Sequence, residues 1–469
     1  MKVFMLGWEF PPHISGGLGT ACYGMTKGLD EIGVEVAFVL PTAVPIDASS
    51  HVQLRTPQSV PFIPGSAGAA GVPISVSVDE QVTRVLEHVK LHQVQAVLQP
   101  YATPESYAQT IRELVQEQIR RQQAGETAPV AGLPAQALAP MQAPTAAPSG
   151  AFVPGGGAHY AGDLMTQVHR YARLAVEIAR TEKFDVVHAH DWMTYPAGLA
   201  VAAATHKPLV IHVHSTEFDR SGENVDQRIY DIERTGMHGA DAIVCVSKLT
   251  RSTVISRYGV PPEKTDVVYN AVEAPDGTEF DLKPIRPTEK IVLFLGRVTM
   301  QKGPEYFLRA AKLVVERFQD VRFVMAGSGD MIRQMVEEAA RLGIGRYVTF
   351  TGFLRGRDVD RIFEMADLYV MPSVSEPFGI APLEALSHNV PVIISKQSGV
   401  SEVLTHVLKV DFWDIDEMAN KILALLRHPP LQKTLRQHGQ FELRKLSWKD
   451  SAIKLNEIYS KIAGIEAPQ

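Results

Sequence analysis

Short runs of apolar and β-branched residues alternate along the chain with longer segments in which apolar residues recur at helical spacing. In the first half of the chain the runs are KVFML, VEVAFVL, DVVHAH, PLVIHVH, AIVCVS and DVVYN. In the second half they are IVLFLG, VRFVMAG, VTFTG, DLYVMPS and VPVIIS. Continuous apolar strands separated by helices are typical of a parallel sheet that helices cover on both faces. The pattern predicts an α/β protein with two Rossmann-like, doubly wound domains.

Two segments interrupt this alternation. Residues 273–290, EAPDGTEFDLKPIRPTEK, are rich in Pro, Gly and charge, and we expect them to link a domain at 1–272 to a domain at 291–445. Residues 122–157 are dominated by Ala, Pro, Gly and Gln. Such a composition buries too little apolar surface to offset the entropy cost of ordering, so we expect a flexible excursion from the first domain.

Composition narrows the class of protein. A chain of 469 residues exceeds one ordinary domain, and 46 Lys and Arg against 52 Asp and Glu give a net charge of −6. This balance argues against a nucleic-acid partner and gives no strong signal of binding to anionic membranes. Two cysteines in so long a chain suit a reducing compartment. Because neither a secretory leader nor an apolar run of ~18 residues is visible, we expect a cytoplasmic protein.

In parallel sheets ligands bind beyond the carboxyl ends of the strands, so the residues that follow each strand are the candidates for a site. After KVFML comes GWEFPPHISGGLGTA, in which Gly16 and Gly17 precede a segment with helical spacing. Glycines there would let backbone amides and a helix N-terminus approach a phosphate group. A tight turn with close helix packing is the alternative interpretation.

Histidines mark the ends of two further strands of the first domain, in HAHDW and VHSTEFDR. We expect the two members of each pair, His188 with His190 and His212 with His214, to point to opposite faces of the sheet. Only one member of each pair would then face a cleft. Strand-end histidines with ordinary partners are more common than metal ligands, and the sequence offers no third ligand at a suitable spacing. We therefore expect no metal site.

Cations appear at the corresponding place in the second domain. Arg297 directly follows its first strand, and Lys302 comes five positions later, just before a segment with helical spacing. A guanidinium fork and an ammonium point charge beside one loop would suit a diphosphate. The next strand ends at Gly327 in AGSGDM, which is either a second phosphate-sized turn or a sharp bend. For both loops a solvated turn remains the alternative.

Two carboxylates flank a turn in SEPFGIAPLEA, residues 375–385. Glu376 lies in the loop after an apolar strand, and Glu384 lies in the helix that we expect to start near Gly379. Pro382 is tolerated because it falls in the first turn of that helix. Glu376 can meet a ligand at the mouth of the cleft, and Glu384 can accept hydrogen bonds from vicinal hydroxyls such as those of a ribose. Solvated glutamates on a helix face remain the alternative.

The combination of G-R-x4-K, E-P-F-G-x4-E and a Gly-Gly loop resembles the retaining glycosyltransferases of the GT-B fold, most closely family 4, with the glycogen and starch synthases as relatives. The resemblance implies that Arg297 and Lys302 bind the donor diphosphate, that Glu376 lies near the transferred sugar and that Glu384 binds the ribose. It also places Phe378 and Gly379 of the E-P-F-G motif in the donor site.

The same resemblance assigns residues in the first domain. It implies that His214 contacts the donor sugar, that Gly16 and Gly17 form the donor loop, and that Asp191 faces the cleft, with His190 beside it. Residues 446–469, which include LSWKDSAIKLNEIYSKI, resemble a C-terminal helix that crosses back to the N-terminal domain. Two departures from bacterial glycogen synthases favour family 4. Ile14 stands where those enzymes carry lysine, and Glu384 stands where they carry tyrosine.

The activity implied is transfer of a hexose, expected to be glucose, from a UDP-, ADP- or GDP-sugar to an acceptor hydroxyl with retention of configuration. No metal and no cofactor is expected, and a glucan is a candidate acceptor. Four alternatives stay open. They are a glycogen synthase-type enzyme, a GT-B hydrolase or epimerase acting on nucleotide sugars, a phosphorylase-like enzyme with pyridoxal phosphate, and a non-catalytic nucleotide-sugar binding protein.

Overall fold

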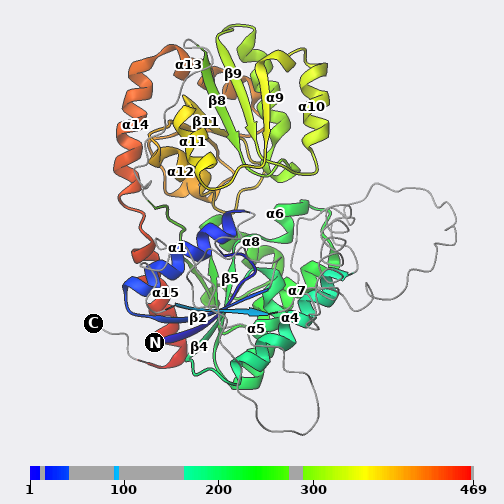
Figure 1. The fold of residues 1–469 in the computed structure, drawn as a ribbon, viewed down its shortest axis with the longest axis vertical. Coiled ribbons are helices and arrows are strands. Elements are labelled where there is room, and N and C mark those ends of the chain that lie inside the picture. The colour runs from blue at the N-terminus through cyan, green and yellow to red at the C-terminus, as the bar shows by residue number, and fades with distance from the viewer. Residues whose placement is uncertain (11–15, 42–88, 95–162, 274–288, 466–469) are drawn as a thin grey trace, which may run out of the picture.

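The computed structural model describes residues 1–10, 16–41, 89–94, 163–273 and 289–465. The expected excursion at 122–157 lies outside the described residues, as does most of the expected linker at 273–290. Figure 1 shows two α/β units stacked along the long axis of the molecule, the lower built from the N-terminal part of the chain and the upper from the C-terminal part.

The N-terminal unit contains a parallel sheet of seven strands in the order β3-β2-β1-β4-β5-β6-β7. The strands are β1 (Lys2–Leu6), β2 (Glu35–Pro41), β3 (Val89–Val94), β4 (Val186–His190), β5 (Leu209–Val213), β6 (Ala242–Cys245) and β7 (Thr265–Val267). Its helices are α1 (Gly17–Glu31), α4 (Asp163–Ala179), α5 (Tyr195–Thr205), α6 (Glu217–Ser221), α7 (Gln227–Gly239) and α8 (Lys248–Tyr258). Short 3-10 turns lie at η2 (Trp192–Thr194) and η3 (Pro262–Lys264).

The C-terminal unit contains a parallel sheet of six strands in the order β10-β9-β8-β11-β12-β13. The strands are β8 (Lys290–Leu295), β9 (Val321–Ala326), β10 (Val348–Gly352), β11 (Leu368–Met371), β12 (Val392–Ser395) and β13 (Leu408–Val410). The helices are α9 (Pro304–Val315), α10 (Ile332–Arg341), α11 (Arg357–Met365), α12 (Ala381–Ser387), α13 (Ile415–Arg427), α14 (Pro429–Leu443) and α15 (Trp448–Ala463). The 3-10 turns are η4 (Met300–Lys302), η5 (Gly345–Tyr347) and η6 (Gly399–Glu402).

Both faces of the N-terminal sheet are buried, as the continuous apolar runs predict. In β1, Val3 and Met5 pack in one hydrophobic cluster, while Phe4 and Leu6 pack in another. Because successive side chains of a strand point to opposite faces, both faces need apolar residues, and an alternating polar pattern would leave one face open to water. The predicted α/β class with two doubly wound units is therefore confirmed.

Each sheet reverses its strand order at one place, which lies between β1 and β4 in the first sheet and between β8 and β11 in the second. At such a switch point the connections leave in opposite directions and open a crevice at the carboxyl ends of the strands. The loops after these four strands carry the Gly-Gly turn, Asp191, Arg297 and Glu376. The topology therefore gathers the candidate residues at the ends of the two sheets.

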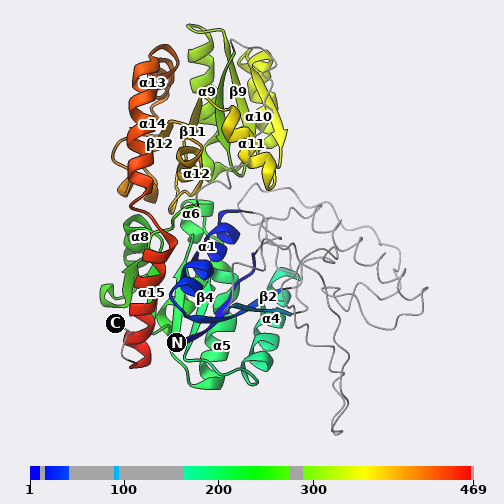
Figure 2. The same cartoon turned by 60° about the vertical axis from the view of Figure 1, so that its left-hand side comes forward.

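The last helix returns to the first unit. In both views α14 runs along the C-terminal unit, and α15 then lies beside α1 of the N-terminal unit (Figures 1 and 2). The packing is close because α1 carries glycines at the contact. A Cβ built on Gly24 would lie 2.1 Å from the indole of Trp448, and one on Gly28 would lie 2.4 Å from the carbonyl oxygen of Trp448.

The apolar runs missed two strands, β3 and β13. Both lie at an edge of their sheet. β3 reads VKLHQV and β13 reads LKV, so neither shows the continuous apolar pattern. An edge strand pairs on one side only and is commonly short or polar, which weakens the signal that identifies a central strand.

Candidate active site

A pocket of about 700 Å³ lies between the two units, at the carboxyl ends of both sheets. Its walls include every predicted site residue except His190. The N-terminal unit contributes Gly16, Gly17, Asp191 and His214, and the C-terminal unit contributes Arg297, Lys302, Gly327, Glu376, Phe378, Gly379 and Glu384. Residues separated by more than 300 positions in the sequence thus share one cavity.

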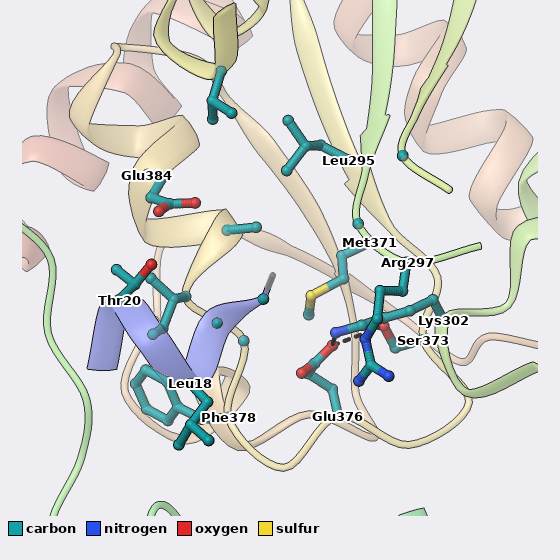
Figure 3. Close-up of a pocket in the computed structure, with 18 of the residues that line it drawn as sticks. Leu18, Thr20, Leu295, Arg297, Lys302, Met371, Ser373, Glu376, Phe378 and Glu384 are labelled. Carbon is teal, nitrogen blue, oxygen red and sulfur yellow. Dashed lines mark hydrogen bonds and ion pairs between the residues drawn. The ribbon is translucent and has the colours of Figure 1, made fainter. Parts of the chain in front are cut away.

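Arg297, Lys302 and Glu376 gather at one end of this pocket (Figure 3). The Lys302 ammonium donates to Glu376 Oε2 at 2.5 Å, and the Ser373 hydroxyl donates to the same oxygen at 3.1 Å. Lys302 ends the turn η4, which follows β8, and Glu376 follows β11, the strand that pairs with β8. Only 6% of Glu376 is exposed. Two donors from its own unit hold its carboxylate in one position.

Two glycines in this region occupy backbone conformations that other residues rarely adopt. Gly379 has φ +100°, and a Cβ there would lie 3.1 Å from Cγ of Glu376. Gly327 has φ +143°, and a Cβ there would lie 1.9 Å from the carbonyl oxygen of Gly296. Glycine is therefore required at both turns, at Gly379 by conformation and at Gly327 also by the close approach of the loop after β8.

Glu384 lies on α12, away from the Lys302 to Glu376 pair (Figure 3). Burial raises its pKa to about 7, and the nearby charge of Asp360 adds to the shift. The group therefore changes charge near neutral pH when the pocket contains no ligand. A hydroxyl donor placed against it would favour the ionised form.

The N-terminus of α1 opens into the same pocket. Gly16 precedes the helix, and a Cβ built on Gly16 or Gly17 would meet no atom of the described residues within 4 Å. The first turn of α1 contains no acidic side chain, although Glu9 accepts a hydrogen bond from the amide of Gly19 at 3.1 Å. A helix of 15 residues whose N-terminus borders the pocket forms a suitable place for an anion.

His214 is the histidine that reaches the pocket, and His190 supports it from behind. His190 Nδ1 lies 2.9 Å from His214 Nε2. Burial lowers the pKa of His214 to about 3 and that of His190 well below its usual value. Both rings are therefore neutral at physiological pH, and one donates a proton in the shared hydrogen bond while the other accepts it.

Asp191 directly follows β4 and has an unusual backbone. Its φ is 64° and its ψ 163°, and non-glycine residues with positive φ are concentrated at functional sites. Burial raises the pKa of its carboxyl to about 6, while the charges of Arg220 and Arg297 act in the opposite direction. Oδ1 has no hydrogen-bond partner among the described residues, which leaves it available to a ligand in the pocket.

The expectation that His188 and His190 point to opposite faces is wrong, and so is the same expectation for His212 and His214. The ring centroids are 4.2 Å apart in each pair, and the rings are stacked. Residues two positions apart in a strand lie on the same face of a sheet. Since β4 and β5 pair with His190 opposite His212, all four rings form one group.

Three of these histidines lie close enough together to be candidate ligands of one metal ion. Ring nitrogens of His188, His190 and His212 lie within 4.8 Å of one another, and all three side chains are buried. Their ring planes are inclined by only 9° to 30°. Nearly parallel rings do not aim their lone pairs at one point, as tetrahedral ligation requires. We assign the group to the core behind the pocket and draw no metal site from it.

Several pocket residues were not predicted. Trp8 and Glu9 follow β1, Asn270 comes three residues after β7, and Phe353 and Arg355 follow β10. Each comes within three residues of the end of a strand. The rule that identified Arg297 would have found them, because the carboxyl ends of all the parallel strands in a sheet meet at one edge.

Three family models match consecutive parts of the chain. Residues 2–120 match the starch synthase catalytic domain, residues 141–274 match Glycosyltransferase Family 4, and residues 277–441 match the glycosyl transferases group 1. The chain is therefore similar to glycosyltransferases of family 4 and of group 1. Within the parts that the structure describes, no helix is both long and apolar enough to cross a bilayer.

The curated relatives of this chain are partial matches. An uncharacterized glycosyltransferase of Methanocaldococcus jannaschii is 34% identical over 245 residues, which is 49% of this chain and 62% of that protein. The D-inositol 3-phosphate glycosyltransferase of Mycobacterium sp. strain KMS is 28% identical over 292 residues, which is 57% of this chain and 65% of that protein. The matches therefore span somewhat less than two thirds of these relatives.

Solved structures share the fold over nearly the whole length. Sucrose-phosphate synthase from Thermosynechococcus elongatus has a TM-score of 0.67 at 16% identity, with 99% of each chain covered. HepE of Anabaena in complex with UDP and glucose has a TM-score of 0.61 at 16% identity, covering 98% of this chain and all of that chain. At this level of identity the likeness establishes the two-domain GT-B fold of this chain and nothing further.

Proposed function

We propose that this protein is a retaining glycosyltransferase that moves a hexose from a nucleotide sugar to an acceptor hydroxyl without a metal ion. The observation that carries the proposal is the pocket between the units, in which Arg297, Lys302 and Glu376 share the cavity with His214 and the N-terminus of α1. Cations, a helix N-terminus and a fixed carboxylate in one cavity suit a negatively charged leaving group next to a sugar.

The diphosphate of the donor would lie against Arg297 and Lys302. Arg297 offers a planar fork of donors, and Lys302 offers a mobile ammonium. As the bond between the anomeric carbon and the phosphate oxygen breaks, negative charge develops on the β-phosphate. Preorganised cations and backbone amides stabilise this charge, which is the role that a bound Mg²⁺ has in other transferases.

The acceptor hydroxyl would attack the anomeric carbon from the face that the phosphate leaves. Its oxygen forms the new glycosidic bond, the phosphate takes the bonding electrons of the old bond, and a phosphate oxygen accepts the hydroxyl proton. Glu376 and the neutral His214 would orient the sugar and stabilise its positive character, without acting as an acid and base pair. The leaving group itself thus supplies the base.

The nucleoside would extend toward Glu384, whose carboxylate accepts hydrogen bonds from ribose hydroxyls. HepE of Anabaena, which shares the fold, has been crystallised with UDP and with UDP-glucose, which supports a uridine donor and glucose as the hexose. ADP- and GDP-hexoses are the other donors to test. We place the reaction in the cytoplasm, since both cysteines are free thiols, as expected in a reducing compartment.

A glucan is one candidate acceptor. With a glucan as acceptor, the protein would be an α-glucan synthase of the glycogen synthase type. The match of residues 2–120 to the starch synthase catalytic domain favours it. Two residues, Ile14 and Glu384, depart from the pattern of bacterial glycogen synthases. This departure favours an acceptor used by family 4 enzymes over a glucan. Acceptor contacts in this fold come from loops of the N-terminal unit.

A donor and acceptor screen tests the proposal. Purified protein is incubated with UDP-, ADP- and GDP-glucose, with glycogen, maltooligosaccharides and small polyols as acceptors, and with EDTA in parallel reactions. We expect transfer that EDTA does not reduce, with an α-configured product by proton NMR. Free sugar or an epimerised donor formed without acceptor would instead identify a GT-B hydrolase or epimerase. Tight UDP binding without turnover would identify a binding protein.

A further inference from the structure

A side-chain hydrogen bond links the two units beside the pocket. The Ser375 hydroxyl of the C-terminal unit donates to Asp219 Oδ1 of the N-terminal unit at 2.6 Å. Ser375 directly precedes Glu376, and Asp219 lies in α6, five residues after His214. The bond therefore connects the loops that carry the two residues proposed to flank the sugar, although neither partner lines the pocket.

Asp219 is itself rigidly placed. Its Oδ2 accepts from the backbone amide of Thr216 at 2.7 Å and from the Thr216 hydroxyl at 2.8 Å. The bond from the Thr216 amide belongs to the capping box of α6, and the two bonds together fix the segment that begins two residues after His214. Asp219 is 7% exposed and Thr216 is fully buried. The carboxylate thus offers Ser375 an acceptor whose position is set by the N-terminal unit.

The other side of Glu376 is also held by the N-terminal unit. The Thr250 hydroxyl donates to the carbonyl oxygen of Pro377 at 3.3 Å. Thr250 is placed by Ser247, which caps α8 and lies 3.0 Å from the Thr250 hydroxyl. Glu376 is therefore flanked by two residues, Ser375 and Pro377, that bond to side chains of the opposite unit. Among the described residues, its own carboxylate bonds to Lys302 and Ser373, which both lie in the C-terminal unit.

We propose that Asp219 is a positioning residue which, through Ser375, aligns the Glu376 loop with His214. The inference rests on the proposed transferase function and adds a residue to it. The donor diphosphate site lies mostly in the C-terminal unit and does not need this bond. The sugar lies between Glu376 and His214, so a small displacement of one loop relative to the other raises the barrier to transfer.

Ser375→Ala removes the bond and leaves the capping box of α6 intact. We expect kcat for transfer from UDP-glucose to fall about 10- to 100-fold, the effect of losing a hydrogen bond to a charged group. The Kd for UDP, measured by calorimetry, should stay within about twofold, since no contact to the diphosphate changes. Ser375→Thr keeps the hydroxyl and should restore kcat. Ser256→Ala removes a serine hydroxyl that bonds within α8 and should leave kcat and Kd unchanged.

Three outcomes would overturn the inference. They are an unchanged kcat in Ser375→Ala, an equal loss in Ser375→Thr, and a rise in UDP Kd that accounts for the whole loss. Hydrogen exchange of residues 373–379 supplies a readout that does not depend on turnover. We expect faster exchange in Ser375→Ala than in the parent, and equal exchange would refute the contact. A parent protein with no transferase activity would overturn the proposed function, while the exchange result would still decide the role of Asp219 in holding this loop.

Discussion

The ammonium of Lys302 lies 2.5 Å from the Glu376 carboxylate, so the cation proposed for the diphosphate and the carboxylate proposed for the sugar form one ion pair. The side chains are 21% and 7% exposed. Because the two side chains pair, each charge has a partner of opposite sign in a poorly hydrated pocket. A donor that places its phosphate beside Lys302 would share that ammonium with Glu376, which links binding of the leaving group to the position of the carboxylate.

Removing either cation should impair transfer strongly. We expect Arg297→Ala and Lys302→Ala each to lower kcat/KM at least ~10²-fold, the scale of losing one preorganised group that stabilises developing charge. Steady-state kinetics with UDP-glucose measure the effect. Lys312→Ala is the matched control, because Lys312 pairs with Glu316 on the outer surface of α9. Near-normal activity of either pocket variant would remove that residue from the diphosphate site.

The two glutamates of the pocket should differ in kinetic effect. Glu384→Ala should mainly raise the KM for the donor, because ribose contacts are made equally in the ground state and the transition state. Glu376→Ala should mainly lower kcat, because Glu376 is proposed to contact the sugar, whose charge changes in the transition state. Separate determination of kcat and KM for both variants checks this, and the reverse pattern would mean that the two roles are exchanged.

The sequence was sufficient for the features that depend on local pattern. Central strands are buried on both faces and are therefore visible as apolar runs, and the residues after them lie at one edge of the sheet, which is why Arg297 and Glu376 could be identified. The edge strand β13, LKV, lacks that pattern. Resemblance to a family supplied the proposed roles of His214 and Asp191, since spacing alone does not separate a site histidine from a core histidine.

The side-chain hydrogen bonds between the units could not be predicted. Asp219 and Ser375 are 156 positions apart, and their hydrogen bond depends on how the two units dock. No periodicity within either segment records that arrangement. The stacking of His188 on His190 is different, because it follows from strand geometry and was available from the sequence.

The contact between α1 and α15 should not tolerate Gly28→Ala. The alanine Cβ would lie 2.4 Å from the Trp448 carbonyl oxygen, which is backbone and cannot rotate away. In a helix interior alanine normally stabilises a protein by up to ~1 kcal/mol relative to glycine. We expect the clash to cost more than this, so that Gly28→Ala lowers the free energy of unfolding by about 1–3 kcal/mol. Thermal unfolding measures the change. Gly345→Ala, where a Cβ meets no atom within 4 Å, should leave the melting temperature nearly unchanged.

The raised pKa of Glu384 should make its contribution to stability depend on pH. The folded-state pKa is about 7 and the usual value is 4.5, so the folded protein binds more protons than the unfolded chain between these values. Ionisation of Glu384 therefore costs stability progressively as pH rises from about 4.5 to 7. Glu384→Gln removes this cost. The melting temperature of the variant relative to the parent should be higher at pH 8 than at pH 4, and a difference that does not change with pH would contradict the shift.

The same group should make donor binding depend on pH. Above about pH 7 Glu384 is ionised and would accept charge-assisted hydrogen bonds from the ribose hydroxyls proposed to lie against it, whereas below pH 7 the neutral carboxyl offers weaker acceptors. Calorimetry gives the Kd for UDP in the parent and in Glu384→Gln between pH 5.5 and 8. The ionisation of UDP itself is common to both proteins and cancels in the ratio of the two constants. We expect the ratio of the variant's Kd to that of the parent to be near one at pH 5.5 and to rise to about tenfold at pH 8, the effect of one hydrogen bond to a charged group. A ratio that stays constant across this range would show that the ribose does not lie against Glu384.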